Sequence, residues 1–362
     1  MAVDLKKLMT GIKDQLDGNF VGYAVAIYQS GTLKLSTSGG WAVIGEKKFD
    51  SNVRFSMGSM GKTISAAAIV RALRERGKSI DDPIHQELVG WEMGPNAKKV
   101  TYRMVLTHTT GLLQNGTTQN ALKARFAKGL PEFSELKLPV PKVPASHRYA
   151  NDNFDLTRFL LPLLTLPTVS RAAMIARGAS DSDWGKAHIA HVKKEILKPC
   201  GLPDVDVVYT GPPPKTRYYA SLVNQQSFHE SNTLARAQEF VGAGWWTMSA
   251  REYAHFIDRL RAGSEVKLFG RPELAQNVAL RGIWKTMRDN RAQTNPEVGL
   301  GLFRTDVPDG DAFWHNGAVP NHSSAWMALP NGISVVICRN SGGGMLPAPE
   351  IVIRTAYEQA LA

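Results

Sequence analysis

Cysteine is scarce in this 362-residue chain, and long apolar runs are missing from it. Two cysteines, Cys200 and Cys338, cannot build the disulfide framework of a small secreted domain. No apolar stretch approaches the roughly 18 residues of a membrane-spanning helix. Residues 1–15 are polar and amphipathic, without the apolar core of a secretory signal. We therefore expect a cytoplasmic protein with no membrane partner, and a periplasmic location stays open if a leader has been removed.

Acidic residues are outnumbered by basic ones, which gives a formal net charge of +11. No nucleic-acid-binding motif accompanies this charge, so we expect a basic, soluble surface and no nucleic-acid partner. Attraction of anionic substrates stays open. The chain is 43% hydrophobic and 21% charged, which is an ordinary globular composition. Its length is enough for a sizeable core, divided over two domains.

Strand-like and helix-like segments are distributed unevenly along the chain. Apolar, β-rich runs lie near both ends, at 21–28 and 333–338. Between about 80 and 235, short helix-like pieces alternate with connectors rich in proline and glycine. This pattern predicts a sheet domain formed by 1–78 and 236–362, with a helical domain inserted at 79–235.

Serine and lysine stand three residues apart at three places in the chain. In a helix such a pair shares one face, with Cβ atoms roughly 5–6 Å apart. A free serine is a poor nucleophile, and a neighbouring base is a standard way to activate it. Ser59 and Lys62 lie where a strand-like run gives way to a helix-like one. We interpret the other two pairs, Ser134 with Lys137 and Ser264 with Lys267, as solvated residues.

Two further short motifs favour the pair that begins at Ser59. Tyr149 and Asn151 form the one Tyr-x-Asn of the sequence, just before a helix-like run. His315 and Gly317 form the one His-x-Gly, near the C-terminal strand-like runs, and the sequence has no Lys-x-Gly. The order Ser-x-x-Lys, Tyr-x-Asn, [His/Lys]-x-Gly resembles the serine β-lactamase and penicillin-recognising hydrolase superfamily. Within it, the chain looks like the class C β-lactamase branch, with its DD-peptidases, D-aminopeptidases, D-amino acid amidases and family VIII carboxylesterases.

Four other segments strengthen the resemblance, and together they cover nearly the whole chain in the expected order. They are 54–59 (RFSMGS), 73–84 (LRERGKSIDDPI), 105–112 (VLTHTTGL) and 196–202 (ILKPCGL). The resemblance implies an α/β (α+β) fold. An antiparallel sheet flanked by helices would be built from both termini, an all-helical domain would be inserted, and the active site would lie in the cleft between them.

The resemblance also implies roles for the catalytic residues. Ser59 would attack an ester or amide carbonyl and form an acyl-enzyme, with Lys62 beneath it helping to take the proton. Tyr149 would act as phenolate or proton relay, first to the leaving group and then for the hydrolytic water. The oxyanion hole of this family uses backbone N–H groups, here those of Ser59 and Ala318.

Four more residues are expected to contact the substrate or the catalytic groups. Asn151 would hydrogen-bond the motif lysine or the substrate. His315 would replace the more familiar lysine of the third motif, as a donor near the substrate carboxylate or Tyr149. Asn316 stands where threonine often sits. Gly317 would let the substrate lie close against the strand, because a side chain would block it.

Two other protein classes stay open from the sequence. Gly61, Lys62 and Thr63 form the second half of a P-loop, although that pattern requires glycine at the position of Ser56. The other class is a catalytically inactive binding protein on the same scaffold, against which the intact motifs argue.

Three more residues have a spacing that could hold a metal on a helix. His188, His191 and Glu195 form a His-x-x-His-x-x-x-Glu array, which we interpret as exposed histidines on a solvated helix. His108, in the segment 105–112, is interpreted as a structural, hydrogen-bonded histidine. We therefore expect no metal and no cofactor.

The third motif bears on the substrate class. With His315 and Asn316 in place of Lys and Thr, the third motif would bind a substrate carboxylate less strongly than that of a dedicated β-lactamase. We therefore expect a small-molecule ester, amide or β-lactam substrate, with a family VIII-type carboxylesterase as the first choice. A D-stereospecific amidase, aminopeptidase or DD-peptidase is the alternative, favoured by residues 340–343 (NSGG) after the last strand-like run.

Overall fold

The computed structural model describes most of the chain. The described residues are 2–113, 118–130, 148–208, 216–228, 234–264, 279–293, 295–342 and 347–361. Of the two alternative Ser-x-x-Lys pairs, Ser134 with Lys137 and also Lys267 lie outside these residues.

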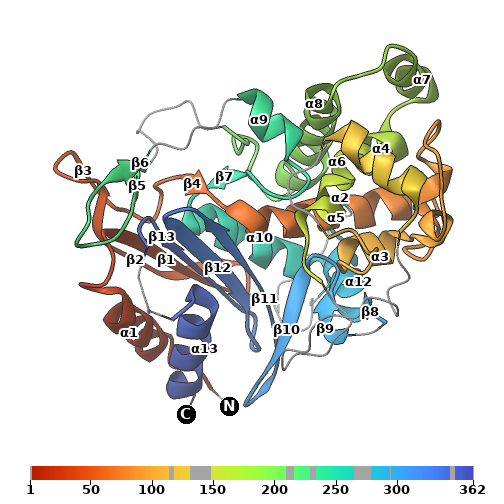
Figure 1. The fold of residues 1–362 in the computed structure, drawn as a ribbon. Coiled ribbons are helices and arrows are strands. Elements are labelled where there is room, and N and C mark those ends of the chain that lie inside the picture. The colour runs from red at the N-terminus through yellow and green to blue at the C-terminus, as the bar shows by residue number, and fades with distance from the viewer. Residues whose placement is uncertain are drawn as a thin grey trace.

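Within the described residues, strands from both ends of the chain form one nine-stranded antiparallel sheet (Figure 1). Its order is β3-β2-β1-β13-β12-β11-β10-β9-β8, so the first and last strands of the chain, β1 and β13, pair in its interior. The strands are β1 (Gly22–Gln29), β2 (Thr32–Val43), β3 (Lys47–Lys48), β8 (Arg291–Ala292), β9 (Asn295–Gly299), β10 (Leu302–Val307), β11 (Gly310–Val319), β12 (His322–Ala328) and β13 (Ile333–Arg339). The predicted sheet from both termini is confirmed.

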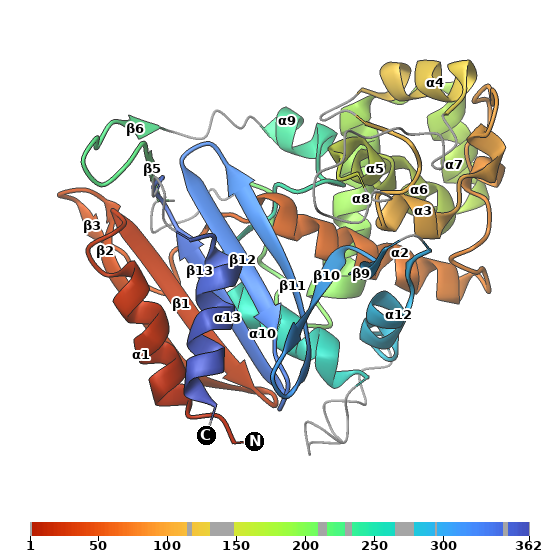
Figure 2. The ribbon, with the colours of Figure 1, turned by 60° about the horizontal axis from the view of Figure 1, so that its bottom comes forward.

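Helices cover the two faces of the sheet, as period-two side-chain alternation requires. The terminal helices α1 (Leu5–Leu16) and α13 (Pro349–Ala360) lie together on one face (Figure 2). Val25 and Ile27 of β1 belong to the core cluster on this face. Ala24 and Ala26, the intervening residues, belong to the cluster on the opposite face, where α10 (Ala250–Ala262) packs against β1 and β13.

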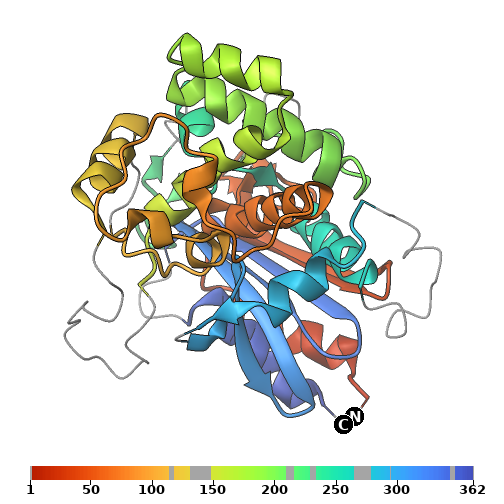
Figure 3. The same cartoon turned by 90° about the vertical axis from the view of Figure 1, so that its right-hand side faces the viewer.

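The middle of the chain is helical and stands beside the sheet (Figure 3). Its helices are α3 (Tyr102–Leu106), α4 (Gln119–Lys128), α5 (Asn151–Asp155), α6 (Thr157–Thr165), α7 (Thr168–Ala176) and α8 (Asp181–Val192), and α8 continues into a π-helical turn, Lys193–Leu197. Two further short helices, α9 (Leu234–Glu239) and α12 (Ile283–Asp289), follow later in the chain.

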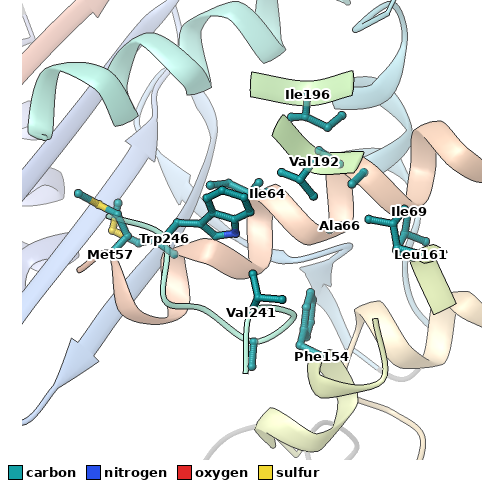
Figure 4. Packing of buried hydrophobic residues seen from close by; sticks show 14 of the residues in the cluster. Met57, Ile64, Ala66, Ile69, Phe154, Leu161, Val192, Ile196, Val241 and Trp246 are labelled. Atoms are coloured by element: carbon teal, nitrogen blue, oxygen red, sulfur yellow. The ribbon is translucent and has the colours of Figure 1, made fainter. Parts of the chain in front are cut away.

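Helix α2 (Gly61–Glu75) connects the two parts and is buried along nearly its whole length. Its apolar residues pack against the helical part on one side and the segment before α10 on the other (Figure 4). Residues labelled there are Met57, Ile64, Ala66, Ile69, Phe154, Leu161, Val192, Ile196, Val241 and Trp246. The start of α2, which carries Lys62 and directly follows Ser59, is therefore held by both parts.

A short hairpin, β5 (Tyr218–Tyr219) with β6 (Ser227–Phe228), departs from the expected domain boundary. The Tyr219 N–H donates to Asn340 O, and the Tyr219 hydroxyl accepts from the Ile44 N–H. We had expected residues up to 235 in the helical insertion, whereas this hairpin is hydrogen-bonded to the sheet part. We propose that the sheet domain resumes at about residue 216.

The histidine array on α8 does not form the solvated face that we expected. His188 is fully buried, with Nδ1 3.2 Å from Thr157 O and Nε2 3.5 Å from Ser65 Oγ. Burial lowers the pKa of His188 to about 3, so this ring is neutral and structural. Among the described residues, no group of three or more side chains is suited to hold a metal ion. In the same residues, no helix is both long and apolar enough to span a bilayer.

Candidate active site

Ser59 lies in a 3-10 turn, Gly58–Met60, immediately before α2. The turn follows β4 (Phe55–Ser56), which pairs with β7 (Thr247–Met248). Met57 N–H donates to Trp246 O at 2.8 Å, and Gly58 takes a left-handed φ of 50° that suits glycine. The serine is thus presented by a short turn anchored on both sides, at the N-terminal end of a buried helix.

Lys62 is fully buried beneath the serine. Its Nζ contacts three oxygens: Ser59 Oγ at 2.9 Å, Asn151 Oδ1 at 2.7 Å and Ala243 O at 2.7 Å. The amide and peptide oxygens can only accept, whereas the serine hydroxyl can donate or accept. A neutral Lys62 would give its two N–H groups to Asn151 and Ala243, which turns its lone pair toward Ser59. This arrangement can remove the serine proton.

The Tyr149 ring lies between two histidine rings. Its centroid is 4.4 Å from that of His108 and 6.2 Å from that of His315, and the side chain stays 39% exposed. Lys62 Nζ is 5.0 Å from the Tyr149 ring centroid. The Tyr149 ring therefore lies near the amine that contacts Ser59, close to where the predicted acid–base relay would need it.

His108 holds this tyrosine more directly than the sequence indicated. Its Nδ1 is 3.0 Å from Ala150 O and 3.3 Å from Ala150 N, on the residue between Tyr149 and Asn151. The ring is almost fully buried and its backbone has a φ of 55°. The predicted hydrogen-bonded role agrees with this geometry. The tilted ring contact with Tyr149 could not be inferred from the spacing.

The edge of β11 lies against the turn Gly58–Met60, which carries Ser59. Pairing of β11 with β10 ends at Trp314, whereas pairing with β12 continues to Val319. A Cβ atom built on Gly58 would lie 3.3 Å from the Ala318 nitrogen, so the strand edge and the turn are in contact. This contact places the Ala318 nitrogen beside the turn that carries Ser59, where the sequence predicts an oxyanion hole.

Gly317 lies where β11 meets the turn that carries Ser59, and protein atoms leave no room there for a side chain. A Cβ atom there would lie 2.1 Å from Met57 O and 2.7 Å from Ser324 Oγ. The missing side chain thus allows β11 to approach the turn that carries Ser59. The sequence interpretation had placed substrate, not protein backbone, against this glycine.

His315 and Asn316 are both held by contacts within the protein. His315 is 1% exposed, packs 5.1 Å from the Phe303 ring and has Nδ1 2.6 Å from Asn316 O. Asn316 Nδ2 donates to Glu350 Oε1 of α13 at 3.1 Å, on the face of the sheet that the terminal helices cover. The His315 ring therefore lies near the Tyr149 ring, whereas the Asn316 side chain lies on the other face of the sheet, away from Ser59 and Tyr149.

A cavity of about 410 Å³ opens beside Ser59. Its lining includes Ser59, Asn151 and Ala318, which the sequence indicated. Asp155, Arg236, Phe240, Trp245, Val319 and Pro320 also line it, and none of them belongs to the sequence motifs described above. Trp246, the neighbour of Trp245, is fully buried in the core. The signal for these six residues would have been their closeness to the motifs in space, which a single sequence does not give.

Comparison with known protein families agrees with this geometry. The Beta-lactamase family model matches residues 5–354, nearly the whole chain. The chain belongs to the Beta-lactamase family. This confirms the predicted superfamily, and several solved structures that resemble this family member are hydrolases by name. No curated protein sequence matches it.

Three of these solved structures show how far the likeness extends. A β-lactamase/D-alanine carboxypeptidase from Pseudomonas syringae aligns over 99% of both chains, with TM-score 0.72 and 14% identity. A D-stereospecific amidohydrolase from a Streptomyces species covers 99% of this chain and 100% of its own, with TM-score 0.67 and 19% identity. A D-amino acid amidase from Ochrobactrum anthropi SV3, complexed with L-phenylalanine amide, covers 98% of both chains, with TM-score 0.66 and 16% identity. At these identities the likeness confirms the Beta-lactamase fold.

Replacing Gly317 of this Beta-lactamase family member by alanine should lower kcat by about 10²-fold or more. The added methyl would overlap Met57 O and push the turn away from Ala318, so the N–H group predicted to stabilise the oxyanion would be misplaced. The measurement is steady-state kinetics on a p-nitrophenyl ester together with thermal unfolding.

The matched control is Asn316→Ala, one residue away with its side chain on the other face. It should keep kcat within about threefold, since substitutions away from special contacts have small effects. Equal losses in the two variants would contradict the role given to the Gly317 contact.

Proposed function

We propose that this chain is a serine hydrolase that cleaves small carboxylic esters through an acyl-enzyme on Ser59, in the manner of a family VIII-type carboxylesterase. The observation that carries the proposal is the contact of Lys62 Nζ with Ser59 Oγ at 2.9 Å, with the other two amine positions held by oxygens that can only accept. This contact gives the serine a base within hydrogen-bond reach.

The reaction has two halves. Ser59 Oγ attacks the ester carbonyl as its proton passes to Lys62, and the N–H groups of Ser59 and Ala318 stabilise the oxyanion. The alcohol leaves with a proton delivered through Tyr149, and an acyl-serine remains. A water then attacks the acyl group, its proton passes back through Tyr149 and Lys62, and the carboxylic acid departs from a regenerated Ser59.

An ester is favoured over a β-lactam by the surroundings of the third motif. A β-lactam carries a carboxylate that a lysine in this motif would contact. His315 is buried to 1% exposure against Phe303 and Tyr149, and Asn316 bonds Glu350. A neutral ester needs no such cation. Weak β-lactam hydrolysis is compatible with the same nucleophile.

A D-stereospecific amidase is the second candidate. Two structural neighbours carry this activity in their names, a D-stereospecific amidohydrolase and a D-amino acid amidase. Amide hydrolysis would use the same groups, with Tyr149 delivering a proton to the leaving amine.

The test compares kcat/KM for p-nitrophenyl butyrate, D- and L-phenylalanine amide, and nitrocefin. The ester should be preferred, and the comparison is repeated with Ser59→Ala as a blank. A strong preference for the D-amide would replace the esterase by the second candidate.

A fluorophosphonate probe distinguishes the serine hydrolase from the P-loop protein and from the catalytically inactive binding protein. It should label the wild type at Ser59 and leave Ser59→Ala unlabelled. ATP binding without labelling would favour a P-loop protein. A wild type that is neither labelled by the probe nor active on these substrates would favour a binding protein.

A further inference from the structure

Trp245 has a backbone conformation that a bulky residue rarely adopts. Its φ is 72°, in the left-handed region, where a large L-residue is strained. Strained residues of this kind persist only when the surrounding structure holds them, and they gather at functional sites. Trp245 is half-buried and lines the cavity into which Ser59 opens.

Contacts of the residues on both sides of Trp245 keep its backbone in this strained conformation. Ala243 O accepts a hydrogen bond from Lys62 Nζ at 2.7 Å. Gly244 packs so closely on the nucleophile turn that a Cβ there would lie 2.7 Å from Gly58 O. Trp246 is fully buried and its carbonyl accepts the Met57 N–H (Figure 4). Because its neighbours are tied to the nucleophile segment, the side chain of Trp245 is directed toward the cavity.

The cavity combines an apolar wall with charges of opposite sign. Phe240, Trp245, Val319 and Pro320 contribute apolar surface. Asp155 and Arg236 also line it, and their opposite formal charges favour neither an anionic nor a cationic group. At about 410 Å³, the cavity lies within the range of roughly 300–1,000 Å³ of small-molecule sites. It therefore has room for an acyl group larger than acetyl.

The cavity lies on the acyl side of the reaction. Tyr149, which would meet the leaving group, is not among its lining residues, and neither is His315. Ala318, whose N–H would hold the oxyanion, does line it. A carbonyl placed between Ser59 and Ala318 would then direct its acyl chain into the cavity and its leaving group toward Tyr149.

We propose that Trp245 is a specificity-determining residue, and that the enzyme prefers substrates with a bulky, uncharged, apolar acyl group such as phenylacetyl or hexanoyl. This inference rests on the proposed function and deepens it by naming the acyl class. An apolar group gains from each methylene that it buries against the ring of Trp245 and its neighbours. Acetyl is too short to use this surface.

The test compares p-nitrophenyl acetate with p-nitrophenyl phenylacetate, so the leaving group is constant. The wild type should prefer phenylacetate by about tenfold or more in kcat/KM. Trp245→Gly removes the ring and accepts a positive φ without strain. It should lower kcat/KM for phenylacetate by about 10- to 100-fold and for acetate by less than about threefold. Trp245→Phe, which keeps an aromatic wall, should retain most of the preference.

The outcomes distinguish a failure of the role given to Trp245 from a failure of the proposed serine hydrolase activity. An equal loss on both esters in Trp245→Gly would mean that the ring supports the catalytic turn, and would overturn the inference. An unchanged preference would overturn it as well, while the serine hydrolase would stand. A wild type that hydrolyses neither ester and is not labelled at Ser59 would remove the proposed function and this inference with it.

Discussion

Lys62→Met is expected to lower kcat by about 10²–10⁴-fold, the contribution of a positioned acid–base group. The methionine removes the amine that lies 2.9 Å from Ser59 Oγ while retaining an unbranched chain of similar length. Ser59→Ala should abolish turnover altogether, because it removes the atom that forms the acyl-enzyme. Steady-state kinetics on p-nitrophenyl butyrate measures both variants.

Burial makes a stability control necessary for this lysine. Lys62 is fully buried, and its loss leaves Asn151 Oδ1 and Ala243 O without that donor, so some destabilisation is expected. Lys285→Met, which removes an exposed lysine paired with Asp289 on α12, is the matched control. Thermal unfolding must show that Lys62→Met is folded at the assay temperature. If the folded variant keeps more than about a tenth of wild-type kcat, Lys62 is not the principal base.

The fold was predictable because its signals are periodic and local. Apolar runs at both ends indicated strands, and the structure pairs β1 with β13 in the interior of the sheet. The hairpin at Tyr218–Phe228 was missed because its hydrogen bonds go to Ile44 and Asn340, which lie far away in sequence. His188 was misinterpreted for a similar reason, since the helices that bury it are remote in sequence.

Some features of the candidate site also follow from local spacing, whereas others depend on segments that are remote in sequence. The spacing of Ser59 and Lys62 is local, so one helical turn is enough to bring them into contact. Asn316 could have been placed correctly from the period of a strand, because neighbours on β11 point to opposite faces. The close approach of Gly317 to Met57 and the strained backbone of Trp245 depend on how separate segments pack. Neither follows from composition or spacing.

Tyr149→Phe is expected to lower kcat by about 10²–10⁴-fold while leaving the fold intact. The phenylalanine ring can keep its place over His108, 4.4 Å away between centroids, and near His315, so the change isolates the hydroxyl. Tyr28→Phe is a matched control, because Tyr28 is also a tyrosine beside a histidine ring, 5.4 Å from His255, and is not part of the cavity lining. It should keep wild-type kinetics.

The step that slows in Tyr149→Phe distinguishes the two jobs given to this residue. If the hydroxyl mainly activates the hydrolytic water, acylation by an activated ester continues and the acyl group accumulates on Ser59. Intact-protein mass spectrometry would then show the adduct, and p-nitrophenol would appear as a burst. If the hydroxyl mainly serves acylation, no adduct builds up and the burst is lost. Since p-nitrophenolate leaves without help from a proton, we expect the burst and the adduct. Near-wild-type turnover in Tyr149→Phe would refute the relay and leave Lys62, with its three oxygen contacts, as the group that moves the proton in both halves of the reaction.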